Sequence, residues 1–154
     1  MSTADVSSEA GGVSRAQGID MMLEVILVPV SDLERATEFY LRLGWRRDDN
    51  TPPGVEQFTP PGSGCSVVFG EGLTSAAPGS AGGFLVVPDI EAAREALVAD
   101  GIEVGEIFHV TPDGPVPGRD PDGGSYVTRA FFSDPDGNSW MLQEITTRLP
   151  GRLG

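Results

Sequence analysis

A pattern that occurs twice constrains the fold of this chain more than any other feature of its sequence. Each copy has an apolar run, an aspartate, apolar residues at helical spacing and then a glycine. At the offset of 57 residues that separates Asp32 from Asp89, the copies align without a gap. The matching pairs are Val28 and Leu85, Val30 and Val87, Asp32 and Asp89, Leu33 and Ile90, Glu34 and Glu91, Ala36 and Ala93, and Gly44 and Gly101. The predicted strand, the helix cap, the helix and the glycine that ends the helix recur in the same order. This indicates an internal duplication of a βαβββ unit.

The duplication predicts an α+β protein with module one over residues 21–71 and module two over residues 83–146. Between the modules, residues 72–82 are rich in glycine, serine, alanine and proline and form a linker. In module one we expect a helix over 33–43 and strands over 21–30, 45–48, 55–59 and 65–69. In module two we expect a helix over 90–99 and strands over 84–87, 104–110, 126–132 and 139–145.

The last two predicted strands are joined by Ser133–Asn138, whose proline, glycine and asparagine favour a reverse turn. The strand after this turn alternates, so its residues divide between two faces: Trp140, Leu142 and Glu144 on one, Ser139, Met141 and Gln143 on the other. A polar pair thus ends an otherwise apolar strand, which suggests a functional site. Upstream, residues 111–125 predict a long loop of the kind that often forms a lid or a wall of a site.

The chain is strongly acidic, with 23 aspartates and glutamates against 10 arginines and a formal net charge of −13. This charge disfavours nucleic acid and membrane surfaces as partners and would favour a cationic ligand. A single cysteine, Cys65, allows neither an internal disulfide nor a multi-cysteine zinc site. No apolar stretch reaches the roughly 18 residues of a membrane span, and no apolar signal core is present, so we interpret the protein as cytoplasmic. Residues 1–18 predict a disordered tail, and residues 147–154 a C-terminal tail.

The duplicated unit, the motif VPVSDLERATEFYLRLGW at 28–45 and the motif FSDPDGNSW at 132–140 resemble the vicinal oxygen chelate superfamily. This superfamily includes glyoxalase I, bleomycin-resistance proteins, fosfomycin-resistance enzymes and extradiol dioxygenases. The resemblance spans residues 21–146 as one domain. It implies two modules whose curled mixed sheets surround a cavity, a small-molecule ligand, and a homodimer in which a second subunit completes that cavity.

The resemblance also implies positions for a divalent metal, and these can be located in this sequence. Seven residues before the two capping aspartates stand Val25 and Gly82, and four residues after the hairpin glycine stands Met141. Valine and glycine offer no donor atom, and a thioether is a soft ligand unsuited to the usual ions of the family. The chain has one histidine, so one subunit cannot build a site with two histidines and a carboxylate. We therefore predict no metal cofactor and no glyoxalase or dioxygenase chemistry of the usual kind.

The residues left for catalysis are His109, Glu144 and Tyr126. His109 is the one imidazole of the chain, a side chain suited to acid–base catalysis, and it precedes the predicted loop. Glu144 could act as a base, and Tyr126 could supply a phenolic donor. Each also has a structural explanation: a satisfied histidine packed under the loop, a carboxylate paired with an arginine, and a core or rim tyrosine.

Four further residues are candidates for binding a ligand. Met141 occupies a metal position, and Gln143 shares its face. Trp140 is better explained as a core residue, and Arg129 is a charge in an apolar strand that needs a partner, water or an anionic ligand. Three functions stay open: a metal-independent lyase, isomerase or hydrolase; a binding dimer that sequesters a drug or metabolite; and a structural or regulatory module.

Overall fold

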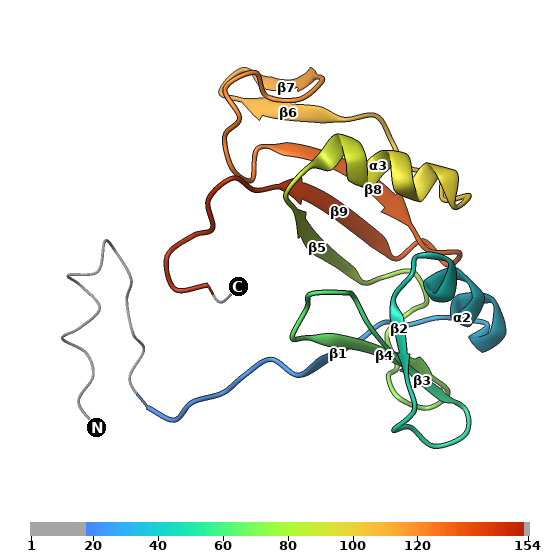
Figure 1. Ribbon diagram of the computed structural model, residues 1–154. Helices are drawn as coiled ribbons and strands as arrows, with labels where there is room; N and C mark the ends of the chain where they lie inside the picture. Colours follow the sequence, from blue (N-terminus) through green and yellow to red (C-terminus); the bar gives the residue numbers. More distant parts are fainter. Residues whose placement is uncertain (1–17, 153–154) are drawn as a thin grey trace.

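Two open mixed sheets, each with one helix against one face, make up the protein (Figure 1). The computed structural model describes residues 18–152. Module one contains β1 (Val25–Leu27), α2 (Leu33–Arg42), β2 (Arg46–Asp48), β3 (Val55–Thr59) and β4 (Ser66–Gly70). Its four strands form sheet A in the order β1-β4-β3-β2.

Module two repeats this arrangement and adds one strand. It contains β5 (Gly82–Val87), α3 (Ile90–Ala99), β6 (Phe108–Thr111), β7 (Gly114–Pro117), β8 (Thr128–Ser133) and β9 (Ser139–Glu144). These five strands form sheet B in the order β5-β9-β8-β6-β7. In both modules the first and last strands pair in parallel and the other neighbours are antiparallel. The predicted α+β fold with a duplicated unit is confirmed.

The two helices begin in the same way, as the duplication predicts. Asp32 and Asp89 are extended residues with φ of −142° and −143°, and each side chain accepts a hydrogen bond from the third following backbone N–H. Both helices span 10 residues. The helix of module one is followed by Gly44, whose φ of 85° lies in the left-handed region that ends helices.

Two predicted strands and one predicted loop differ from the structure by more than two residues. The strand predicted over 21–30 is only Val25–Leu27, because β4 offers partners to those three residues alone. The strand predicted over 104–110 starts at Phe108. The predicted loop over 111–125 contains β7, whose alternating prolines are tolerated at a sheet edge, where their missing N–H groups face outward. Of the predicted tails, residues 1–17 and 153–154 lie outside the described residues, and the remainder contains no helix or strand.

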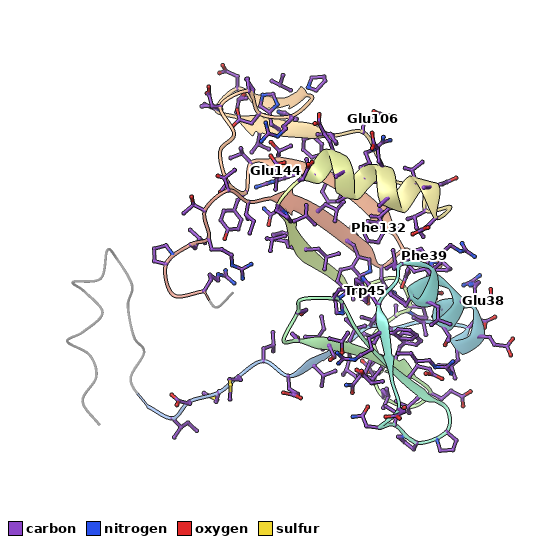
Figure 2. The ribbon with its side chains drawn as sticks, viewed as in Figure 1. Glu38, Phe39, Trp45, Glu106, Phe132 and Glu144 are labelled. Carbon is purple, nitrogen blue, oxygen red and sulfur yellow. The ribbon has the colours of Figure 1, made fainter. Side chains whose placement is uncertain are left out.

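One hydrophobic cluster spans the junction between the modules. Figure 2 shows Phe39 and Trp45 of module one beside Phe132 of module two, and the rings of Phe39 and Phe132 lie 6.3 Å apart. At its centre, the buried Tyr40 hydroxyl donates to Asp134 Oδ2 at 2.8 Å and accepts from Trp140 Nε1 at 3.1 Å. Burial, followed by the negative charge of Asp134, raises the pKa of Tyr40 above its ordinary value.

The predicted hairpin turn holds the same junction together. Gly137 N–H donates to the Asp134 carbonyl at 3.0 Å, which closes the turn between β8 and β9. Asn138 is fully buried, and its amide donates across the modules to the Pro29 carbonyl at 2.8 Å. Ser31 donates through its hydroxyl to Asp136 Oδ1 at 2.6 Å. The turn residues therefore fix the second module against the strand-to-helix connection of the first.

Among the described residues, no helix has the length and apolarity that crossing a membrane requires.

Candidate ligand-binding face

The two faces of sheet B have different environments. Helix α3 covers the face that carries Trp140, Leu142 and Glu144 (Figure 1). Met141 and Gln143 point to the opposite face because side chains alternate along β9. We call this opposite side the open face of sheet B.

Aromatic residues surround Met141 on the open face. The register places Phe84 of β5 and Phe131 of β8 on either side of Met141. Phe84 is 71% exposed and Phe131 is 45% exposed, whereas Met141 is 4% exposed between them. The ring of Phe108 stacks on that of Phe131, with centroids 6.0 Å apart and planes 17° apart. These four residues form an aromatic platform, and clustered exposed apolar side chains of this kind mark binding surfaces.

A polar pair lies beside the platform. Arg129 and Gln143 face each other across β8 and β9, two residue pairs beyond Phe131 and Met141, and so form the next pair on the same face. The Arg129 Nε and the Gln143 Nε2 both donate to the carbonyl oxygen of Tyr126, each at 3.2 Å. No ion pair within residues 18–152 involves Arg129. Two sequence-predicted ligand-binding residues, Gln143 and Arg129, are thus neighbours, and both border the predicted Met141.

Tyr126 is held in an unusual backbone conformation. Its φ of 72° is the one positive value at a non-glycine residue in the described part of the chain. Such a conformation costs about 1–3 kcal/mol and persists where surrounding contacts enforce it. Here the Tyr126 N–H donates to the Glu144 carbonyl at 2.7 Å, and its hydroxyl accepts from the Leu149 N–H at 3.0 Å.

Glu144 lies on the other face of the sheet, at the start of α3 (Figure 2). It is 1% exposed. One oxygen accepts the Ile90 N–H at 3.0 Å, at the first residue of α3, and the other accepts Arg119 Nε at 2.7 Å. A carboxylate at a helix N-terminus is stabilised by the helix dipole and satisfies an N–H that lacks an intrahelical partner. This geometry matches the paired-carboxylate alternative for Glu144.

His109 is buried on the same face as Glu144. It pairs with Thr128 across β6 and β8, and its Nδ1 lies 2.8 Å from the Gly118 carbonyl, to which an Nδ1–H donates. The ring is therefore engaged by the segment that follows β7. Trp140 also lies on this side, 3% exposed, with its indole N–H on Tyr40. The predicted residues divide into two sets, so His109 and Glu144 do not share a face with Gln143.

Sheet A contributes a polar network that the sequence analysis did not identify. Asp48 accepts hydrogen bonds from Arg46 Nε at 2.6 Å, Thr59 Oγ1 at 2.7 Å and Gln57 Nε2 at 3.1 Å. Desolvation raises the pKa of Asp48, but these hydrogen bonds outweigh it and the pKa lies below its usual value. The sequence feature that could have indicated this network is the alternation of Gln57 and Thr59 along β3. Both residues face away from the side that carries Phe58.

The side chains at the expected metal positions do not fit a divalent metal ion. Val25 pairs with Ser66 on sheet A, and Gly82 lies on the open face of sheet B with Met141. Val68 pairs with Leu27 as Met141 pairs with Phe84, so it occupies the position of module one that corresponds to Met141. Val25, Gly82, Val68 and Met141 offer no oxygen or nitrogen side-chain ligand. The described residues also contain no cluster of three or more histidine, cysteine, aspartate or glutamate side chains able to hold an ion.

Comparison with known proteins identifies the family of this fold. Residues 22–142 match the model of the Glyoxalase/Bleomycin resistance protein/Dioxygenase superfamily. TnmS3, an antibiotic binding protein from Streptomyces sp. CB03234, has a similar structure, with 27% identity and a TM-score of 0.65 over 84% of this chain and 100% of its own. A glyoxalase/bleomycin resistance protein from the same organism shows 29% identity and a TM-score of 0.59 over 79% and 99%.

A third similar structure is a superfamily member from Sphaerobacter thermophilus DSM 20745, with 26% identity and a TM-score of 0.58 over 81% of this chain and 98% of its own. None of the curated proteins matches the sequence.

Proposed function

Because the chain belongs to the glyoxalase/bleomycin-resistance/dioxygenase superfamily, we propose that it is a metal-independent binding protein for a small aromatic molecule. The ligand lies against the open face of sheet B. A homodimer encloses it there, with a second subunit as the other wall.

The aromatic platform is the observation that carries this proposal. Phe84 and Phe131 are large apolar side chains that one chain leaves 71% and 45% exposed, on either side of a buried methionine. Aromatic rings exposed on a sheet face bind other planar rings through stacking and the hydrophobic effect. The similar structure of an antibiotic binding protein supports a role in binding a small molecule.

The positions of the candidate catalytic residues favour binding over catalysis. A metal-free enzyme needs an acid or base within hydrogen-bonding reach of its substrate. Glu144 is instead occupied by Arg119 and the N-terminus of α3, and His109 by the Gly118 carbonyl. Both lie on the side of sheet B away from the platform. The metal-independent lyase, isomerase or hydrolase therefore stays a prediction without a supporting contact.

The experiment is a thermal-shift screen of the full chain with two- and three-ring aromatic compounds, followed by isothermal titration calorimetry. Phe84→Thr should weaken binding by about tenfold, the loss expected for one stacked aromatic contact of 1–1.5 kcal/mol. Threonine keeps strand propensity, and Phe84 is exposed, so the melting temperature should change little.

Val116→Thr is the matched control, because Val116 is also an exposed apolar strand residue, but it pairs with His109 on the other face. It should bind like the unchanged protein. If no aromatic compound raises the melting temperature, or if Phe84→Thr binds as tightly as Val116→Thr, the proposal fails.

A further inference from the structure

We propose that this site selects aromatic ligands that carry an anionic group, and that Arg129, positioned by the Tyr126 carbonyl, is the residue that makes the selection. This inference rests on the proposed function and adds the charge of the ligand. It runs against the sequence-based expectation of a cationic ligand, which was drawn from the net charge of the whole chain.

Arg129 is a half-buried cation without a carboxylate partner in the described chain. Its Nε donates to the Tyr126 carbonyl, which leaves the two terminal nitrogens of the guanidinium for another acceptor. A guanidinium that is partly removed from water is stabilised by an anion, and its planar fork matches the two oxygens of a carboxylate. Gln143 lies opposite and also donates to the Tyr126 carbonyl, so the pair points polar groups to one spot on the open face.

The strained Tyr126 backbone explains why these two side chains are held there. The residue before it is fixed to the C-terminal segment, since Ser125 Oγ accepts N–H groups of Thr146 and Thr147 at 2.6 Å each. Tyr126 itself is fixed at both its N–H and its hydroxyl. In this conformation its carbonyl oxygen accepts hydrogen bonds from both Arg129 and Gln143. Backbone strain that is maintained by contacts on several sides, at the edge of a candidate site, is typical of positioning devices.

The spacing and the charges of the open face fit an aromatic anion. Arg129 and Phe131 are two residues apart on one strand, which separates them by about 7 Å along the face. A ring stacked on Phe131 would therefore place a carboxylate substituent near the guanidinium. None of the residues that the strand pairings place on this face of sheet B is acidic, and Arg129 is its cation. Within the site, the local charge is positive although the protein is strongly negative.

The test is calorimetric titration of the full chain with 2-naphthoate, 2-naphthamide and 2-naphthylmethylamine, which share a ring system and differ in charge. The unchanged protein should bind the carboxylate about tenfold or more tightly than the amide, as expected for one charge-assisted hydrogen-bonded pair. Arg129→Gln should remove this preference while amide binding stays within about twofold. Glutamine can still donate to the Tyr126 carbonyl, and the melting temperature of the variant reports whether it is folded.

Arg42→Gln is the matched control. Arg42 is exposed at the end of α2, and the substitution changes the net charge by the same amount. It should keep the preference for the carboxylate. Equal binding of the three probes, preference for the amine, or a carboxylate preference that survives Arg129→Gln would overturn the inference and leave the proposed function standing.

Binding of none of the probes, together with no aromatic compound that raises the melting temperature in the screen, would overturn both proposals. If sedimentation then shows a dimer that Phe84→Thr converts to a monomer, the open face is covered by a second copy of the chain and not by a ligand.

Discussion

Replacing Glu144 by glutamine tests whether its carboxylate has a structural or a catalytic role. The side chain of Glu144 is 2% exposed and pairs with Arg119 Nε at 2.7 Å. Breaking a buried ion pair by removing one partner costs about 3–5 kcal/mol. The cost here should be lower, about 2–3 kcal/mol, because the Arg119 side chain is 39% exposed and can regain water, and because glutamine keeps an oxygen for the Ile90 N–H.

In a protein of this length, 1 kcal/mol corresponds to about 2–4 °C in melting temperature, so Glu144→Gln should lower it by roughly 5–10 °C. Thermal and urea unfolding followed by circular dichroism measure this change. Arg119→Gln should also destabilise, since it leaves a buried carboxylate with one donor. The double variant should lose less than the sum of the two single losses, because the side chains interact directly.

A surface ion pair provides the control for this prediction. The Arg47 and Glu56 side chains lie 2.6 Å apart, but the Arg47 side chain is 50% exposed, so Glu56→Gln should lower the melting temperature much less than Glu144→Gln. Aromatic probes should still bind folded Glu144→Gln, because Glu144 faces away from the platform. A variant with an unchanged melting temperature that has lost ligand binding or turnover would refute this reasoning and place Glu144 in the functional site.

Three further predictions follow from other parts of the structure. Elemental analysis of the purified protein should find no stoichiometric divalent metal, and about one chelator-removable ion per chain would contradict this. Gly83→Ala should lower stability by about 1–3 kcal/mol in urea unfolding, because its Cβ would lie 2.6 Å from the buried Trp140 ring; Gly82→Ala, with 3.2 Å to its nearest atom, should cost less. Asp48→Asn should lower the melting temperature at pH 7 more than at pH 3. The lowered pKa of Asp48 contributes stability above about pH 4, its unfolded value, and that contribution is lost as the pH falls through the folded value; an equal loss at both pH values would contradict this.

Local chemistry made the helices and the hairpin predictable from the sequence. The helix of module two spans Ile90–Ala99 as predicted, and that of module one ends at Arg42, one residue before the predicted end. Aspartate caps and terminal glycines act within a few residues, so they can be recognised without knowledge of the tertiary structure. The turn at Asp134–Asn138 was predictable for the same reason.

Strand limits depended on partners that the sequence does not show. The run before Pro29 has the composition of a long strand, yet it is paired only where β4 reaches it. The prolines of β7 would exclude a central strand, but they are compatible with the outermost position in sheet B. Both predictions failed because pairing and edge position are properties of the sheet.

The site could be predicted only in part, because alternation along a strand assigns residues to two faces without saying which face is open. The sequence placed Met141 with Gln143, and Trp140 with Glu144, and the register confirms this division. Packing decides that the second pair is covered: the start of α3 covers Glu144, and Tyr40 and Trp45 of module one pack against Trp140. The exposed Phe84 was not identified as a site residue. It corresponds to Leu27 in β1 through the duplication, but this correspondence does not indicate that the side chain is exposed.

The net charge of the chain does not predict the charge of the ligand that we propose. A net charge of −13 acts over the whole surface, and salt screens it beyond about 8 Å at physiological ionic strength. A bound ligand interacts with the few groups that it touches, where water is partly excluded and a hydrogen-bonded charge has its largest effect. On the open face, that group is Arg129, held by the Tyr126 carbonyl, and Tyr126 is itself fixed by hydrogen bonds to its N–H and its hydroxyl. Acidity of the chain therefore governs which molecules approach it at long range, whereas the arrangement around Tyr126 governs which of them bind.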